Sequence, residues 1–262
     1  MKKVLFTGAR SGIAHATIKR IVNKKDYELY VTVHTEKQLE LVKETYKNYD
    51  NVKCLKVDIT NEKDLQQIEA LDIDILVNNA AIGVGGSIAE IPMAKVRQCF
   101  EVNVFGTFTV VQRVLKRMMQ KGEGKIINIS SLAGLIPMKF LGVYGASKAS
   151  VSLLTRTLRK ELKIINKNIK IVLIEPGLYK TGFNQVMLEN KYDWMRTKSY
   201  FSEELKIIKK CENKLFNLLE KRNLNSIAKK IVKAITCDNP CPIYRAPCLY
   251  AIFVKLYNFF TN

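Results

Sequence analysis

Residues 3–14 read KVLFTGARSGIA, a short apolar run followed by a turn that contains two glycines. The run at 3–7 has the composition of a buried strand, and Ser11 is placed to cap a helix over roughly residues 12–22. Gly8 permits a tight turn, and Gly12 lets the backbone approach a pyrophosphate at the N-terminus of that helix. The stretch therefore predicts a strand, a phosphate-binding turn and a helix.

The same alternation of strands and helices continues along most of the chain. Further apolar runs of strand length, with helical patterns between them, occur at 28–33, 52–57, 73–77, 125–130 and 169–174. Such alternation, with nearly continuous Val, Ile and Leu in the strands, predicts an α/β fold with a parallel sheet covered on both faces. We find no linker and no internal repeat, so we expect residues 1–262 to form a single domain.

Polar residues and turns directly follow the predicted strands. Ligands of such sheets bind beyond the carboxyl ends of the strands. The positions that fall there are Thr7 with Gly8, Asp58, Asn78, Ser131 and Pro176. Their coincidence predicts one composite site.

Tyr144 stands thirteen residues after Ser131, and Lys148 follows it four residues later. On a helix these two positions share a face, so we expect the ammonium to lower the pKa of the phenol. A tyrosine tuned in this way can exchange a proton with an oxygen at carbon. The alternative is an ordinary solvated Tyr–Lys pair, which the matching motifs elsewhere in the chain disfavour.

Taken in order, these motifs resemble the short-chain dehydrogenase/reductase family over about residues 2–182. The resemblance implies a Rossmann-type, doubly wound parallel β-sheet flanked by helices. It also implies an NAD(P)-dependent enzyme that interconverts a ketone and a secondary alcohol. Two positions depart from the family pattern, because Ala14 and Ala81 stand where glycine is usual.

The resemblance assigns four catalytic positions. Tyr144 would be the general acid in reduction and the base in oxidation, and Lys148 would lower its pKa and hold the nicotinamide ribose. Ser131 would hydrogen-bond the carbonyl oxygen; Ser130 is the adjacent alternative, but the spacing to Tyr144 favours Ser131. Asn103 would hold a water that relays protons from Lys148 to solvent.

The cofactor contacts implied by the resemblance run from the glycine turn to the end of the sixth strand. Asp58 would contact the adenine, and the segment 176–181 would hold the nicotinamide. The full set is Gly8, Arg10, Ser11, Gly12, Ile13, His34, Thr35, Asp58, Ile59, Asn79, Ala80, Tyr144, Lys148, Pro176, Gly177 and Thr181.

The end of the second strand bears on the choice of cofactor. An acid there would bind the ribose 2′-hydroxyl and repel a 2′-phosphate, but the chain has no acid before Glu36. His34 falls where relatives that use the phosphorylated cofactor often carry arginine, and Arg10 is a second candidate phosphate partner. We therefore expect NADP(H) to be favoured over NAD(H), although both side chains could be plain surface residues.

Residues 181–223 interrupt the alternation with aromatic residues and a helical run. An insertion at this point is usually a lid over the substrate; a plain packing helix pair is the alternative. The apolar character predicts a hydrophobic substrate of steroid, lipid or acyl type. A non-catalytic NADP(H)-binding scaffold or sensor is the rival function, and the intact catalytic set argues against it.

The formal charge of +19 has three readings. Lysine can simply be the default surface residue, the charge can attract an anionic surface or phosphate-bearing ligand, or it can serve nucleic acid. We favour the first with a contribution from the second, because the cations are spread along the chain without a nucleic-acid motif.

The cysteines and apolar segments bear on location. The six cysteines lack zinc spacing, so we expect no metal and reduced thiols in a cytoplasmic enzyme. The run at 3–7 is too short for a signal peptide. The tail at 246–260 is strongly apolar, and it can pack on the core, join a homodimer or homotetramer, or dip into a membrane interface. We favour packing or dimerisation.

Overall fold

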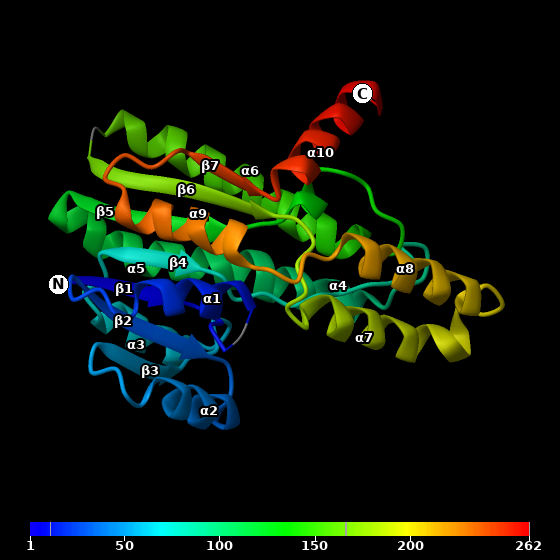
Figure 1. The fold of residues 1–262 in the computed structure, drawn as a ribbon, viewed down its shortest axis with the longest axis horizontal. Coiled ribbons are helices and arrows are strands. Elements are labelled where there is room, and N and C mark those ends of the chain that lie inside the picture. The colour runs from blue at the N-terminus through cyan, green and yellow to red at the C-terminus, as the bar shows by residue number, and fades with distance from the viewer. Residues whose placement is uncertain (11, 166, 262) are drawn as a thin grey trace.

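The computed structural model describes residues 1–10, 12–165 and 167–261. Its centre is a parallel sheet with the strand order β3-β2-β1-β4-β5-β6-β7 (Figure 1). The order reverses between β1 and β4, as in a doubly wound sheet. The strands are β1 (Lys2–Phe6), β2 (Tyr27–Val33), β3 (Val52–Lys56), β4 (Ile75–Asn78), β5 (Glu123–Ile129), β6 (Asn168–Pro176) and β7 (Ile243–Ala246).

Helices cover both faces of the sheet because alternate strand residues point to opposite sides. Val4 and Phe6 of β1 pack in one apolar cluster with α1 (Gly12–Ile21), α2 (Glu36–Tyr46) and α9 (Asn225–Thr236). Leu5 packs in the opposite cluster with α3 (Glu62–Ala70), α5 (Thr107–Lys121) and α6 (Gly142–Ile164). The doubly wound α/β prediction is confirmed.

Local sequence signals explain where several helices begin. Thr35 caps α2 by accepting a hydrogen bond from the Gln38 amide, and Asn61 caps α3 by accepting from the amides of Lys63 and Asp64. The long helical region predicted after Pro92 contains an unforeseen interruption. A π-helical turn at Glu101–Gly106 separates α4 (Met93–Phe100) from α5. Such turns are frequent at functional sites, and this one carries Asn103.

Residues 181–223 form two helices, α7 (Phe183–Lys198) and α8 (Leu205–Leu219). They extend together away from the sheet at its carboxyl end (Figure 1). Their shared apolar cluster includes Met187, Tyr192 and Phe216. The cluster also contains Tyr144, so the pair packs directly against the predicted catalytic tyrosine.

The C-terminal part differs from the expectation. A seventh strand, β7, extends the sheet, and α10 (Cys248–Thr261) follows it. Tyr250 at the start of α10 touches the body of the protein through a hydrogen bond to the Leu219 carbonyl. Large apolar side chains farther along α10 remain exposed, so the core does not cover them, and the alternative that the tail forms a dimer contact stays a prediction. Within the described ranges, every helix falls short of the length or apolar character needed to cross a membrane.

Candidate active site

The glycine turn adopts a backbone shape that side chains rarely tolerate. Gly8 has φ +62° and Gly12 has φ +67°, both in the left-handed region. A Cβ on Gly8 would lie 2.6 Å from the Cα of Ala80, and one on Gly12 would lie 3.2 Å from the Cβ of Thr181. The turn thus packs closely against two other segments predicted to bind the cofactor, those of Ala80 and Thr181. Ser11, also predicted to contact the cofactor, lies outside the described residues.

A hydrogen-bond network fixes this turn to the end of β4. The Thr7 hydroxyl donates to Asn78 Oδ1 at 3.0 Å and accepts from the amides of Asn79 and Ala80. The Asn79 side chain donates to the Gly8 carbonyl at 2.9 Å. The sequence motifs predict only that Thr7 stands at a strand end, whereas in the structure its hydroxyl joins the two loops.

Ala14, one of the two departures from the family pattern, lies in the protein core. Ala14 is buried within the apolar cluster that α1 shares with the sheet. Its methyl group therefore fills core volume and does not stand in the turn. Ile13 packs half-buried against the same cluster.

The predicted adenine end lies beyond β2 and β3. His34 Nε2 lies 3.5 Å from Asp58 Oδ2, and the His34 side chain is 66% exposed. Asp58 also accepts hydrogen bonds from the amide and hydroxyl of Thr60. Ile59 is buried against Gly106. Arg10 is exposed and forms no ion pair with a described residue, so its charge is open to a ligand.

Ser131, Tyr144 and Lys148 meet at the end of β5. Ser131 caps the short 3-10 turn Leu132–Gly134, where its oxygen accepts from the Ala133 amide at 3.1 Å, and it hydrogen-bonds Tyr144. The Lys148 ammonium lies 5.9 Å from the Tyr144 ring centre and donates to the Ile129 carbonyl at 3.1 Å. The predicted serine, tyrosine and lysine are therefore neighbours in space.

The electrostatics of this trio differ from the expectation. Burial raises the pKa of Tyr144, and the hydrogen bond with Ser131 opposes this only in part. Burial also lowers the pKa of Lys148 to about 8. The prediction that the ammonium lowers the tyrosine pKa is wrong in this structure, because burial is the largest influence on the Tyr144 pKa and raises it.

Asn103 is fully buried in the π-helical turn. Its side chain accepts from the Ile82 amide at 2.8 Å and donates to the Ile82 carbonyl at 2.9 Å. It also donates to the Ser147 hydroxyl at 3.0 Å, and that hydroxyl donates to the Tyr144 carbonyl. Asn103 therefore links the loop after β4 to α6. Its role in holding a relay water stays a prediction.

A second buried network lies behind the trio, and no sequence motif predicts it. Ser130 donates to the Lys148 carbonyl at 2.7 Å and accepts from Ser152 at 2.8 Å. Glu175 is buried beside Ser152 and pairs with Arg245 of β7 at 2.6 Å. The neighbouring Pro176 carbonyl accepts a long hydrogen bond of 3.4 Å from Ser131. Ser130 is thus a structural neighbour that braces the helix of Lys148.

The face of Tyr144 away from the sheet is apolar. The Tyr144 and Phe183 ring centres are 5.6 Å apart. The glycine-rich loop after β4 packs closely on α7, since a Cβ on Gly83 would lie 2.8 Å from Met187 and one on Gly86 would lie 2.1 Å from Trp194. Trp194 also donates to the Gly85 carbonyl at 3.4 Å.

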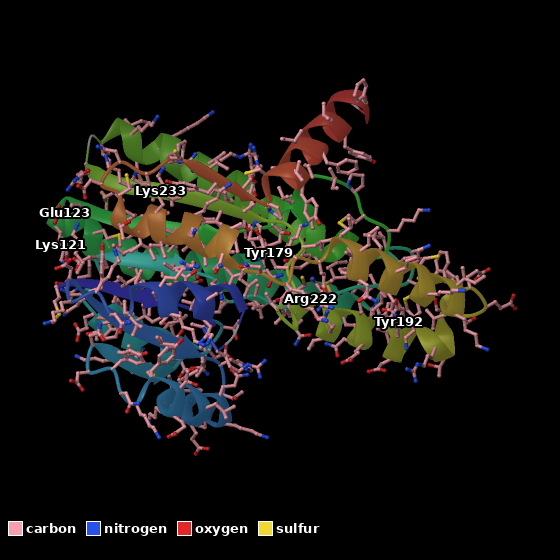
Figure 2. All side chains as sticks on the ribbon, in the orientation of Figure 1. Lys121, Glu123, Tyr179, Tyr192, Arg222 and Lys233 are labelled. Carbon is pink, nitrogen blue, oxygen red and sulfur yellow. The ribbon has the colours of Figure 1, made fainter. Side chains whose placement is uncertain are left out.

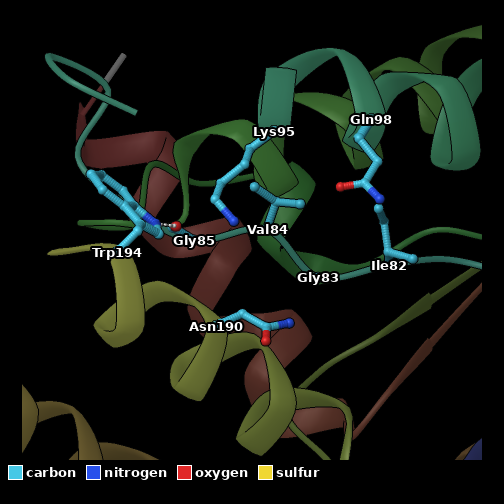
Figure 3. Close-up of a pocket in the computed structure, with 8 residues that line it drawn as sticks. All are labelled: Ile82, Gly83, Val84, Gly85, Lys95, Gln98, Asn190 and Trp194. Carbon is cyan, nitrogen blue, oxygen red and sulfur yellow. Dashed lines mark hydrogen bonds between the residues drawn. The ribbon is translucent and has the colours of Figure 1, made fainter. Parts of the chain in front are cut away.

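A small cavity of about 150 Å³ lies between this loop, α4 and α7 (Figure 3). Ile82 and Trp194 form apolar parts of its wall. Lys95, Gln98 and Asn190 supply polar groups around it (Figure 3). It lies beside the loop that Asn103 holds.

Comparisons with known proteins agree with this geometry. Residues 2–191 match the family model described as short chain dehydrogenase. The chain is a short-chain dehydrogenase. This dehydrogenase is 31% identical over 236 residues to the probable short-chain type dehydrogenase/reductase VdlC of Helicobacter pylori, with 87% of this chain and 82% of the relative covered.

A second relative of the dehydrogenase is the 3-ketodihydrosphingosine reductase of Bacteroides thetaiotaomicron, 31% identical over 237 residues with the same shares covered, 87% and 82%. A solved short chain dehydrogenase/reductase from Burkholderia phymatum, in complex with NAD, superposes with a TM-score of 0.82 at 23% identity. That alignment covers 98% of this chain and 93% of the other, and it shows the shared fold. The dehydrogenase is thus an oxidoreductase that acts on CH–OH groups with NAD(P).

Proposed function

We propose that this dehydrogenase uses NADPH to reduce a hydrophobic ketone to a secondary alcohol. The observation that carries the proposal is the position of Tyr144. Its hydroxyl lies at Ser131 and its ring lies in the apolar cluster of α7 and α8. A carbonyl brought to that hydroxyl therefore has apolar side chains around the rest of its molecule.

The chain's own groups are suited to deliver a proton. With its pKa raised by burial, Tyr144 is protonated at neutral pH and can act as the general acid. A bound nicotinamide supplies the hydride. Ser131 donates a hydrogen bond to the carbonyl oxygen as negative charge develops there. Lys148, with a pKa of about 8, is mostly charged at pH 7 and stabilises the phenolate left after the proton is given.

The glycine turn fits a dinucleotide. Side chains at Gly8 and Gly12 would fill the space beside Ala80 and Thr181, and both glycines hold conformations suited to close approach of a ligand. At the adenine end, Arg10 and the exposed His34 offer cationic or hydrogen-bonding groups to a 2′-phosphate. These features support NADPH as the preferred cofactor.

The helix pair α7 and α8 supports the proposals that the substrate is hydrophobic and that this pair forms a lid over it. Its apolar cluster meets Tyr144, and α7 packs on the glycine-rich loop across the site. The Bacteroides relative is named for a keto substrate, 3-ketodihydrosphingosine. We therefore place the substrate among ketones with a large apolar part.

Replacement of Tyr144 by Phe tests the chemistry. The variant keeps the ring but loses the proton donor, so we expect kcat for ketone reduction to fall on the order of 10²-fold or more. NADPH binding, measured by fluorescence titration, should be retained. Tyr200→Phe is the control, because Tyr200 is largely exposed and outside the site. Wild-type turnover by Tyr144→Phe would rule out the proposed acid.

Cofactor choice is tested by titration with NADPH and NADH. Wild type should bind NADPH more tightly, and Arg10→Ala should weaken NADPH about tenfold while leaving NADH nearly unchanged. Lys163→Ala serves as the control for loss of one exposed cation. Equal affinity of the wild type for both cofactors would contradict the assignment.

A further inference from the structure

Helix α10 carries an apolar stripe without a cover. The helix leaves the body of the protein at the β7 edge, and the C-terminus lies at its outer end (Figure 1). Positions 249, 252, 253 and 256 recur at helical spacing, so their side chains share one side of the helix. They are 53% to 73% exposed and are Leu249, Ile252, Phe253 and Leu256. A monomer rarely leaves so large an apolar surface open.

A basic cleft of about 550 Å³ opens at the root of α10. Lys221, Arg222 and Lys229 line it, and Figure 2 shows Arg222 where the chain passes from α8 to α9. Arg20 adds a fourth cation through its hydrogen bond to Asn225, another lining residue. Among residues 1–10, 12–165 and 167–261, no carboxylate forms an ion pair with any of these four cations.

The cleft and the helix are parts of one surface. Pro247, which directly precedes α10, forms part of the cleft wall. Lys221 Nζ lies 5.9 Å from the ring centre of Tyr250 in the first turn of α10. Helix α10 itself contains no acidic residue. The apolar stripe therefore begins beside a group of unpaired positive charges.

We propose that α10 and this cleft form a docking site for an anionic lipid bilayer. The apolar stripe enters the interface between headgroups and acyl chains, and the cations of the cleft meet lipid phosphates. A second copy of the chain fits this surface poorly. In a two-fold dimer the same patch of both copies meets, and α10 offers no acidic side chain to pair with the cations of the cleft.

Docking has a consequence for the active site. A Cβ on Gly177 would lie 2.9 Å from Tyr250 and 3.1 Å from Pro247, so the root of α10 touches a segment predicted to hold the nicotinamide. The active site would then lie close to the bilayer, which can supply an apolar ketone. This consequence rests on the proposed function, whereas docking itself does not.

Vesicle sedimentation of the full chain without substrate tests the proposal. Wild type should pellet with phosphatidylcholine vesicles that contain phosphatidylglycerol, pellet weakly with phosphatidylcholine alone, and be released by high salt. Ile252→Gln/Phe253→Gln should weaken binding at least tenfold, because it removes apolar burial. Arg222→Gln/Lys229→Gln should weaken binding about 25-fold, from roughly 1 kcal/mol, or about fivefold, for each cation.

Two matched variants control for the general effects of removing exposed apolar side chains and exposed positive charges. Ile207→Gln/Leu218→Gln replaces two exposed apolar residues on α8, and Lys160→Gln/Lys163→Gln removes two exposed cations on α6. Both should bind vesicles like wild type. All variants should keep NADPH-dependent turnover of a water-soluble ketone, which separates a failure of docking from a failure of the proposed reaction.

Three results would overturn the docking proposal. The first is a wild type that stays in the supernatant with anionic vesicles at low salt. The second is an Ile252→Gln/Phe253→Gln variant that binds as tightly as its α8 control. The third is analytical ultracentrifugation in which that variant changes a wild-type oligomer into a monomer while vesicle binding is absent, since a second copy would then cover the stripe.

Discussion

Lys148 brings a charge into the protein interior, and replacing it by Met tests the cost of that charge. Its ammonium donates to the Ile129 carbonyl at 3.1 Å, and no carboxylate among the described residues forms an ion pair with it. Burial lowers its pKa from 10.5 to about 8. A shift of that size corresponds to roughly 3 kcal/mol against the charged form.

The sign of the pH dependence follows from this shift. At pH 7 Lys148 is charged in the folded and the unfolded chain, so the folded protein bears the full cost. Between pH 8 and 10.5 the folded state has already released the proton that the unfolded state still binds. The free energy of unfolding of the wild type therefore rises with pH across this window, as far as Lys148 determines it.

Lys148→Met should separate stability from activity. Removing the charge gains about 3 kcal/mol at pH 7, and leaving the Ile129 carbonyl without its donor costs about 1 kcal/mol. We expect the variant to be more stable than wild type by about 2 kcal/mol at pH 7 and nearly equal to it at pH 10. Its kcat should fall sharply, because the phenolate of Tyr144 loses its stabilising cation.

Urea unfolding of both proteins at pH 7, 8, 9 and 10 measures the difference, which cancels the titration of all other groups. Lys163→Met is the control for loss of an exposed lysine from the same helix. A stability difference between Lys148→Met and wild type that stays constant from pH 7 to pH 10 would refute the reasoning.

Three further changes test other parts of the structure. Gly86→Ala places a Cβ 2.1 Å from Trp194, so the fluorescence emission of this single tryptophan should shift and KM for an apolar ketone should rise about tenfold. The control is Gly122→Ala, which has no neighbour near the added Cβ and should leave the emission unchanged. Unchanged emission in Gly86→Ala would contradict the packing. Glu175→Gln breaks a buried pair with Arg245 and should lower the free energy of unfolding by about 2 kcal/mol, whereas exposed Glu189→Gln should not; equal urea midpoints for the two variants would count against it. Gly8→Ala collides with Ala80 and should abolish NADPH binding in a calorimetric titration while the chain stays folded, an expectation that wild-type affinity would exclude.

The sequence allowed the first six strands to be predicted because each is an apolar run bounded by turn residues. Strand β7 escaped notice because four residues, Ile243–Ala246, give too short a pattern between two prolines. The π-helical turn around Asn103 also has no periodic signal, since it changes the hydrogen bonding inside a continuous helical pattern.

The sequence predicts which residues form the candidate site more fully than it predicts their pKa values. The spacing of Ser131, Tyr144 and Lys148 was enough to expect them together, and the structure brings them together. The direction of the Tyr144 pKa depends on burial by α7 and α8, which lie far along the chain. Sequence spacing reports the neighbouring charge but not the water that is removed, so the predicted direction was wrong.

The loop of Gly83, Gly85 and Gly86 meets helix α7 with backbone at these three glycines, while Ile82 and Val84 of the same loop pack in one cluster with Trp194. At the glycines the loop therefore has no side chains with which to distinguish one substrate from another. We expect much of the selectivity to come from helix α7, which supplies Met187 and Trp194 beside these glycines. A change of substrate range can thus be sought by altering α7, while Ser131, Tyr144 and Lys148 are left untouched at the end of β5.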